Sequence, residues 1–306
     1  MMYPKTIMLT PRKGAQGHVR LPGSKSISNR VLLLAALAQG ATQLRHVLDS
    51  DDTQVMIDSL KKLGVSISSR TGGDDESANS LDLLVQGVGG VFPTVGTVDA
   101  PLKLFIGNSG LTIRTLVPAL VVSMAKSGGC VEISGVERMH ERPIADLVDG
   151  LKAIGARIEY LGTPGFPPLR IVGAPLSAQP KISVKGSTSS QYLTGLMQAA
   201  PLLALQWQQP IALAVDGELI SKPYVEITRA VLRRFGVQID QTSADPMRYV
   251  IAPAMIQAAG DLTVEGDASS ASYFLAAGAI GHGPVRVIGA GRDSVQGDVR
   301  FADALE

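Results

Sequence analysis

Four similar segments recur along this 306-residue chain at intervals of about eighty residues, and this repetition restricts its fold more than any other feature. In each segment, glycine and small polar residues directly precede an apolar run that is rich in alanine and leucine. The four segments begin at Gly23, Gly107, Gly186 and Gly266, so the intervals are 84, 79 and 80 residues. A period this regular is typical of a fold assembled from copies of one supersecondary unit.

A second motif recurs in step with the first. It consists of an amphipathic stretch, a glycine and a short segment of alternating polarity, and it occupies residues 60–67, 151–158 and 232–239. This order is typical of the last turn of a helix, a glycine that adopts a left-handed conformation, and a strand with one buried face.

Each unit is therefore predicted to contain a helix, a strand, a second helix and a further strand. The second helices are marked by Asp51, by Arg142 and Pro143, and by Lys222 and Pro223, because proline is well tolerated in the first turn. Residues 81–85 and 169–172 are predicted to add strands in the linking stretches. The predicted fold class is α/β.

The fourth copy stops early. In the first three copies the opening glycine precedes the helix-ending glycine by 41, 48 and 50 residues. The copy that opens at Gly266 should therefore end its second helix between residues 307 and 316, whereas the chain ends at Glu306. We expect this chain to be part of a longer one; the alternative is a natural end with a frayed helix.

The composition excludes several classes of function. With 28 basic and 27 acidic residues, the net charge of +1 gives no general attraction to nucleic acid or membranes. Cys130 is the single cysteine, and the four histidines are too widely spaced to suggest a metal site. The most apolar stretch, residues 111–124, is interrupted by Arg114 and Pro118, and the start of the chain has no signal-peptide core. We expect a cytoplasmic protein without a metal.

The loops before the helices could hold anions. Backbone N–H groups and the positive end of the helix dipole favour phosphate or carboxylate at a helix start. Cations follow these loops in the sequence, at Lys25, Arg30, Arg114, Arg142 and Lys222. Neither a P-loop nor the GxGxxG spacing is present. The structural alternative is that the loops only cap helices, while the two guanidinium groups of Arg30 and Arg114 lie on solvated helix faces.

Six motifs together give a specific resemblance. In chain order they resemble those of the 5-enolpyruvylshikimate-3-phosphate (EPSP) synthase family, from about residue 8 to the last residue. They are LPGSKSISNR (21–30), GNSG (107–110), ERPI (141–144), SSQYLT (189–194), SKPY (221–224) and GDASSASYF (266–274).

The resemblance implies an enzyme that transfers the enolpyruvyl group of phosphoenolpyruvate to the 5-hydroxyl of shikimate 3-phosphate and releases phosphate. It also implies two domains, each with three copies of a β-α-β-α-β-β unit. On that basis, residues 22–260 form a complete three-unit domain, and residues 1–21 and 261–306 belong to the other domain. The family is typically monomeric and uses neither cofactor nor metal.

The resemblance also implies roles for individual residues. Lys25 is expected to lie between the two substrates and contact both. The shikimate 3-phosphate site would contain Ser26, Arg30, Ser189, Ser190, Gln191, Ser221 and Tyr224. The phosphoenolpyruvate end would contain Gly110, Arg142 and Gln191, with Asn108 and Arg114 in support and Asp52 and Asp267 behind the contacting residues.

Two alternatives remain at this stage. The related enzyme that acts on UDP-N-acetylglucosamine typically has Lys-Asn where this chain has Lys25 and Ser26, and it carries a mobile-loop cysteine that Cys130 does not resemble. A repeat scaffold without catalytic activity would bind neither phosphorylated ligand. Because the acid used in proton transfer lies in the family's C-terminal part, we expect this chain to be inactive on its own.

Overall fold

The secondary structure follows the repeat. The computed structural model describes residues 6–8, 10–69, 79–179, 181–186, 189–242 and 245–306. The first unit contains α1 (Lys25–Leu37), β2 (Gln39–Leu48), α2 (Asp51–Lys62), β3 (Ser66–Ser69) and β4 (Ser80–Val88). The second contains β5 (Leu102–Phe105), α3 (Gly110–Ser127), β6 (Cys130–Ser134), the 3-10 helix η1 (Glu137–Glu141), α4 (Ala145–Lys152), β7 (Arg157–Tyr160) and β8 (Leu169–Val172). The third contains β9 (Lys181–Lys185), α5 (Ser190–Trp207), β10 (Ile211–Asp216), α6 (Lys222–Arg234), β11 (Ile239–Thr242) and β12 (Asp245–Ile251).

The remaining elements are β1 (Gly17–Arg20), β13 (Asp261–Thr263), α7 (Ala268–Ile280), β14 (Val285–Ile288) and the 3-10 helix η2 (Gly297–Phe301). The predicted α/β class is confirmed. Gly64, Gly155 and Gly236 all have positive φ angles, between 77° and 98°, as expected for glycines that end helices.

Three four-stranded sheets share one topology. Their strand orders are β5-β6-β8-β7, β9-β10-β12-β11 and β13-β2-β4-β3. In every sheet the first two strands are parallel and the other neighbours are antiparallel. The units that look alike in sequence are therefore also alike in hydrogen-bonding pattern.

The first and fourth units exchange their leading strands. β1 leads into α1 but pairs with β14, whereas β13 leads into α7 but pairs with β2. The two connections lie side by side and bond to each other. The amide of Ser24 donates to the carbonyl of Glu265 over 2.8 Å, and the amide of Asp267 donates to the carbonyl of Pro22 over 2.9 Å. Gly23 is required at this crossing, because a Cβ there would lie 2.0 Å from the carbonyl oxygen of His46.

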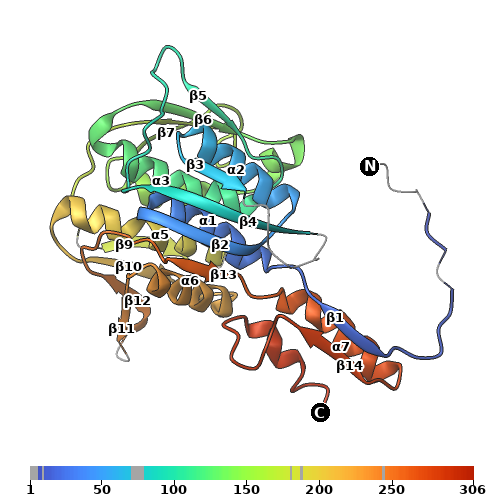
Figure 1. Cartoon of the computed structure of the whole chain (residues 1–306). Coiled ribbons are helices and arrows are strands. Elements are labelled where there is room, and N and C mark those ends of the chain that lie inside the picture. Colours follow the sequence, from blue (N-terminus) through green and yellow to red (C-terminus); the bar gives the residue numbers. More distant parts are fainter. Residues whose placement is uncertain (1–5, 9, 70–78, 180, 187–188, 243–244) are drawn as a thin grey trace.

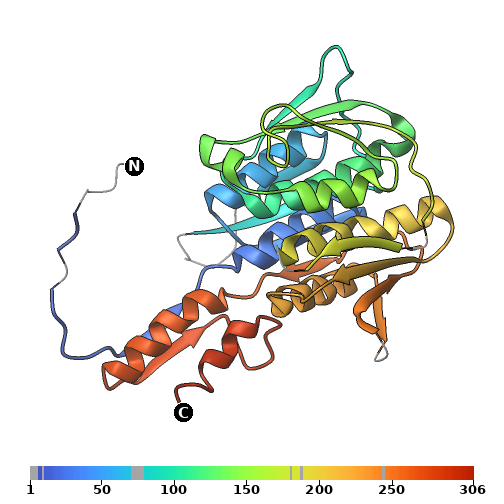
Figure 2. The ribbon, with the colours of Figure 1, turned by 180° about the vertical axis from the view of Figure 1, so that it is seen from behind.

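The first helices of units one, two and three, α1, α3 and α5, lie within the core. In α1, all residues from Ile27 to Leu37 are buried, and α3 is buried from Gly110 to Ala125. A helix that is hydrophobic all round has to be enclosed by other elements. α1 packs against α3 and α6, and α3 packs against α5. Figures 1 and 2 show the sheets around these central helices.

Two local predictions differ from the structure. The second helix of unit two begins at Ala145 rather than at Pro143, because the preceding residues form η1 and Arg142 is extended, with φ −93° and ψ 121°. The expected second helix of unit four is the 3-10 helix η2, in which the amide of Ala302 bonds to the carbonyl of Val299, three residues back.

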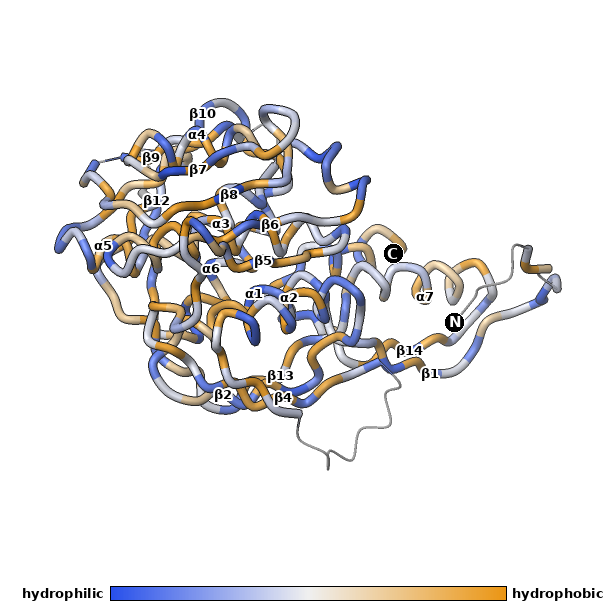
Figure 3. The backbone as a smooth tube through the Cα atoms, turned by 90° about the horizontal axis from the view of Figure 1, so that it is seen from above, coloured by the Kyte–Doolittle hydropathy of each residue, from blue (hydrophilic) through white to orange (hydrophobic). Residues whose placement is uncertain are grey.

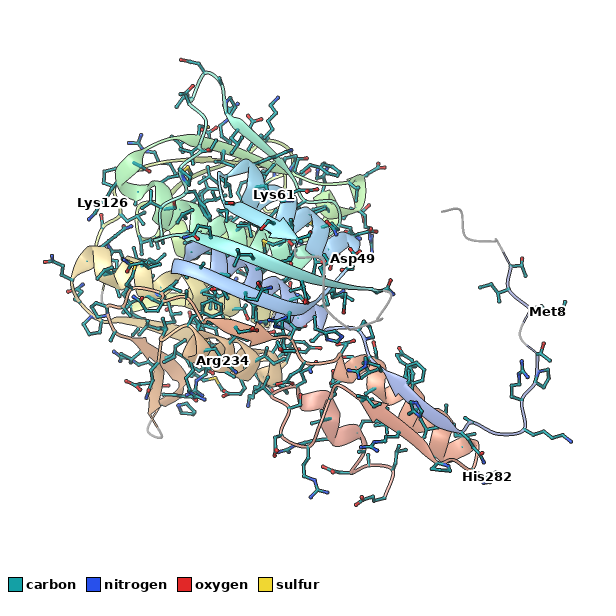
Figure 4. The ribbon with its side chains drawn as sticks, viewed as in Figure 1. Met8, Asp49, Lys61, Lys126, Arg234 and His282 are labelled. Carbon is teal, nitrogen blue, oxygen red and sulfur yellow. The ribbon has the colours of Figure 1, made fainter. Side chains whose placement is uncertain are left out.

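β1, α7, β14 and η2 form a smaller portion that projects from the main body (Figure 1). Within α7 only Ala268 and Ala271 are buried, although its backbone is coloured mainly as hydrophobic in Figure 3; Ile280, for example, is 81% exposed. In the main body, Asp49, Lys61, Lys126 and Arg234 lie at the surface, and His282 lies near the far end of the smaller portion (Figure 4). The predicted domain boundary at residues 260 and 261 remains a prediction.

Candidate anion-binding site

A pocket of about 170 Å³ opens where four helices begin. It is lined from α1, α3, α5, α6 and the loops before them, so helix starts that are distant in sequence converge on one place. Seven of the predicted substrate-binding residues line it together: Ser26, Arg30, Ser189, Ser190, Gln191, Ser221 and Tyr224. Leu111 and Ile220 complete the lining.

Arg30 is the charged centre of this pocket. Its side chain is only 1% exposed, and among the described residues it has no carboxylate within ion-pair distance. The alternative of a solvated helix face is therefore wrong for Arg30. Burial lowers the pKa of its guanidinium to about 10, an effect that the nearby Tyr224 partly opposes.

Neutral groups hold the Arg30 guanidinium. Nε donates to Thr228 Oγ1 over 2.9 Å, and Nη2 donates to Thr194 Oγ1 over 3.1 Å and to the carbonyl of Tyr224 over 3.2 Å. Nη1 donates to the carbonyl of Ser26 over 2.7 Å. These four bonds occupy four of the five N–H groups of a guanidinium and leave one on Nη1. The bonds fix the cation without neutralising it.

The starts of α5 and α6 lie at this pocket, where the positive ends of the two helix dipoles add to the potential. The side chain of Ser189 caps α5 by accepting from the amide of Gln191 over 3.2 Å. Ser221 precedes α6 in a left-handed conformation, with φ 55° and ψ 41°, and Pro223 stands in the first turn. A serine in this conformation is strained, and such strain is most often found at functional sites.

Lys25 lies outside the pocket lining. Its Nζ forms an ion pair of 3.4 Å with Asp52 of α2, and its side chain is 57% exposed. Asp267 caps α7, where Oδ2 accepts from the amide of Ser270 over 3.2 Å and from its hydroxyl over 2.7 Å.

A second cluster of predicted residues lies at the start of α3. Arg142 Nη1 donates to the carbonyl of Asn108 over 2.9 Å. Its guanidinium lies so close to Gly110 that a Cβ there would be 2.4 Å from Nη2. Arg142, Asn108 and Gly110 thus lie together at the start of α3, and their role at the phosphoenolpyruvate end stays a prediction.

Arg114 links the pocket to this second cluster. It is buried, so the solvated-face alternative is wrong here too, and burial lowers its pKa. Nη1 donates to Gln191 Oε1 over 2.6 Å, and Nη2 donates to the carbonyl of Pro143, next to Arg142, over 3.0 Å.

Four further residues at the site were missed as candidates. Thr194 and Thr228 hold Arg30, and each stands four residues after a pocket residue, Ser190 and Tyr224, on the same helix. That helical spacing was a usable signal. Leu111 and Ile220 carry no polar group, and nothing in the sequence distinguished them from core residues.

The described ranges contain neither a cluster of side chains that could bind a metal ion nor a helix that could span a membrane. Within them, no three His, Cys, Asp or Glu side chains are arranged to hold a metal ion. No helix in that part of the chain has both the length and the apolar content needed to cross a bilayer.

Comparison with known proteins gives consistent matches. A family model described as EPSP synthase (3-phosphoshikimate 1-carboxyvinyltransferase) matches residues 9–306. The chain is 52% identical over 310 residues to the 3-phosphoshikimate 1-carboxyvinyltransferase of Herminiimonas arsenicoxydans, a match that covers 99% of this chain and 64% of that protein. Identity to the enzyme of the same name from Ralstonia pickettii is 54% over 295 residues, covering 96% and 63%.

Solved structures share the fold. An EPSP synthase from Acinetobacter baumannii superposes with a TM-score of 0.69 at 22% identity, covering 87% of this chain and 54% of that one. The enolpyruvyl transferase NikO from Streptomyces tendae gives 0.57 at 18% identity, covering 90% and 58%. The chain thus spans about 64% of the length of its similar curated relatives.

Proposed function

The chain belongs to the EPSP synthase family, and on this basis we propose that it supplies the shikimate 3-phosphate site of an enolpyruvyl transferase. The proposed reaction transfers the enolpyruvyl group of phosphoenolpyruvate to the 5-hydroxyl of shikimate 3-phosphate and releases phosphate. The relatives from Herminiimonas and Ralstonia are named for this transfer. The whole protein would act on small molecules in the cytoplasm as a monomer, without a cofactor.

The observation that carries the proposal is the buried cation of Arg30. A guanidinium removed from water without an anionic partner is costly, and its four neutral acceptors only partly offset that cost. A phosphate group in the pocket would supply the missing negative charge and accept from the remaining Nη1 N–H. The same pocket is lined by four serines, Ser26, Ser189, Ser190 and Ser221, and by Gln191. Serine hydroxyls and the side-chain amide of glutamine suit a phosphorylated polyol.

The second anion would bind beside the first. We place the carboxylate and phosphate of phosphoenolpyruvate near Arg142 and Gly110, with Gln191 between the two substrates. Lys25, at the start of α1, would contact both once it exchanges Asp52 for substrate. Fixed cations and amides of this kind stabilise charge that develops during transfer, particularly where water is excluded.

The test is a set of calorimetric titrations of the 306-residue chain. Shikimate 3-phosphate should bind to a single site, and UDP-N-acetylglucosamine should not. Shikimate without phosphate, the matched control, should bind much more weakly, because it lacks the charge that Arg30 requires. Preferential binding of the UDP-sugar would favour the related transferase. Binding of neither phosphorylated ligand would favour the repeat scaffold and overturn the proposal.

A further inference from the structure

Tyr192 is a buried residue next to the pocket that the proposed chemistry does not use. It follows Gln191 in α5, and its side chain is 0% exposed. Its hydroxyl donates a hydrogen bond of 2.7 Å to the carbonyl of Pro143. Pro143 directly follows Arg142, the cation of the second cluster. The bond therefore ties α5, which starts at the shikimate 3-phosphate pocket, to the segment that carries Arg142.

Arg114 reinforces the same connection. The Pro143 carbonyl accepts from Tyr192 and, over 3.0 Å, from Arg114 Nη2. The Arg114 guanidinium also lies 5.3 Å from the centre of the Tyr192 ring, a cation–π distance. A carbonyl with two buried donors, which contact each other, has little freedom to move.

The position of Arg142 depends on this anchor. Its side chain is held by the carbonyl of Asn108 and rests against the backbone of Gly110. That placement requires the main chain at residues 142 and 143 to stay at a fixed distance from α3. The segment lies between η1, which ends at Glu141, and α4, which begins at Ala145. The amide of Arg142 bonds to the carbonyl of Met139 over 3.2 Å, and the amide of Ile144 bonds to the carbonyl of Gly165 over 2.9 Å. The two side-chain donors to the Pro143 carbonyl add to these backbone bonds.

We propose that Tyr192 is a positioning residue for phosphoenolpyruvate: its hydroxyl holds the Arg142–Pro143 segment so that Arg142 is preorganised for the second anion. This inference rests on the proposed function, because it assumes that Arg142 binds phosphoenolpyruvate. Tyr192 does not touch either substrate, and its effect reaches phosphoenolpyruvate through Arg142.

The test replaces the hydroxyl and measures both ligands separately. In Tyr192→Phe, phosphoenolpyruvate should bind about three- to tenfold more weakly to the chain saturated with shikimate 3-phosphate, the range expected for one buried hydrogen bond. Affinity for shikimate 3-phosphate should change less than about twofold. Tyr249→Phe removes another buried tyrosine hydroxyl, on β12, and should alter neither affinity.

Two further variants separate positioning from general destabilisation. In an Arg142→Ala background, Tyr192→Phe should cause no additional loss of phosphoenolpyruvate affinity, since the residue it positions is gone. Tyr192→4-aminophenylalanine restores a donor at the same place and should recover the wild-type affinity; this variant also serves if the phenylalanine variant fails to fold.

Each contrary result has a distinct meaning. Equal losses for both ligands, additive losses in the double variant, or no rescue by the amine would overturn the positioning role. A wild-type chain that binds shikimate 3-phosphate but no phosphoenolpyruvate would overturn this inference and leave the first site intact. A chain that binds neither would overturn the proposed function and this inference with it.

Discussion

Arg30 and Thr228 are separated by 198 residues in the sequence, yet Nε of Arg30 donates a 2.9 Å hydrogen bond to Oγ1 of Thr228. The Thr228 hydroxyl lies 3.0 Å from that of Thr194, which also contacts Arg30. One residue from each of α1, α5 and α6 thus meets in a buried polar contact beneath the pocket. The position of the cation is a property of the assembled helices and of no single motif.

Arg30→Lys should weaken shikimate 3-phosphate binding about 10- to 100-fold, as measured by calorimetry. Lysine keeps the charge but cannot direct N–H groups to Thr228, Thr194 and a phosphate at once, because it lacks the planar fork. Arg45→Lys is the matched control: Arg45 is exposed and pairs with Asp261 at the surface, so ligand affinity should not change. Equal affinities for wild type and Arg30→Lys would remove Arg30 from the site.

Thr194→Val should lower the free energy of unfolding by about 1–2 kcal/mol in urea titrations. Valine has nearly the shape of threonine but no hydroxyl, so one N–H of the buried Arg30 guanidinium loses its acceptor. Shikimate 3-phosphate affinity should fall a few-fold as Arg30 gains freedom. Thr115→Val is a suitable comparison, because that buried hydroxyl bonds to two carbonyls of its own helix, those of Leu111 and Thr112. If the two valine variants behave alike, Thr194 does not support Arg30.

Much of the fold could be predicted because the repeat carries it. The period of about eighty residues, the helix-ending glycines and the alternating segments are local signals, and each corresponds to an element in the structure. The exchange of β1 and β13 between units could not be predicted in this way. Both strands precede a helix in the sequence, and their partners are set by which sheet they complete, a choice that depends on long-range packing.

The residues of the candidate site were predicted from resemblance and charge. Properties that depend on tertiary packing could not be predicted from either. Seven predicted residues line one pocket because they belong to motifs at helix starts. The sequence indicated a cation at position 30 but not its burial, because the solvated face of a helix has the same pattern of residues. The proposed positioning role of Tyr192 could not be predicted, because its partner is the backbone carbonyl of Pro143. Every residue carries a backbone carbonyl, so the sequence does not indicate which one accepts this bond.

Gly195→Ala should destabilise the protein by about 3 kcal/mol or more. Gly195 lies where α5 crosses α3, and a Cβ there would be 2.0 Å from the carbonyl oxygen of Arg114, a backbone atom that cannot move aside. Gly291→Ala is the control, because no atom in the described part of the chain lies within 4 Å of a Cβ at that position. Thermal unfolding should separate the midpoints of the two variants by about 5 °C. Similar midpoints would mean that α3 and α5 can move apart without loss of stability.

Tyr160→Phe should raise the free energy of unfolding by about 1 kcal/mol at neutral pH, because the Tyr160 hydroxyl is buried without a hydrogen-bond partner among the described residues. Burial, with smaller contributions from Asp149, Tyr192 and Asp146, raises the pKa of this tyrosine to about 12.

The raised pKa adds a pH dependence. In the unfolded chain the Tyr160 hydroxyl loses its proton near pH 10, before it does so in the folded chain, so Tyr160 lowers the free energy of unfolding as the pH rises from about 10 to about 12. The phenylalanine variant should lack that part of the alkaline decline. Urea titrations at pH 7, 10 and 11 measure both effects, with Tyr273→Phe, whose side chain is exposed, expected to match wild type at pH 7. A variant that is less stable than wild type at pH 7 would mean that the Tyr160 hydroxyl has a partner after all.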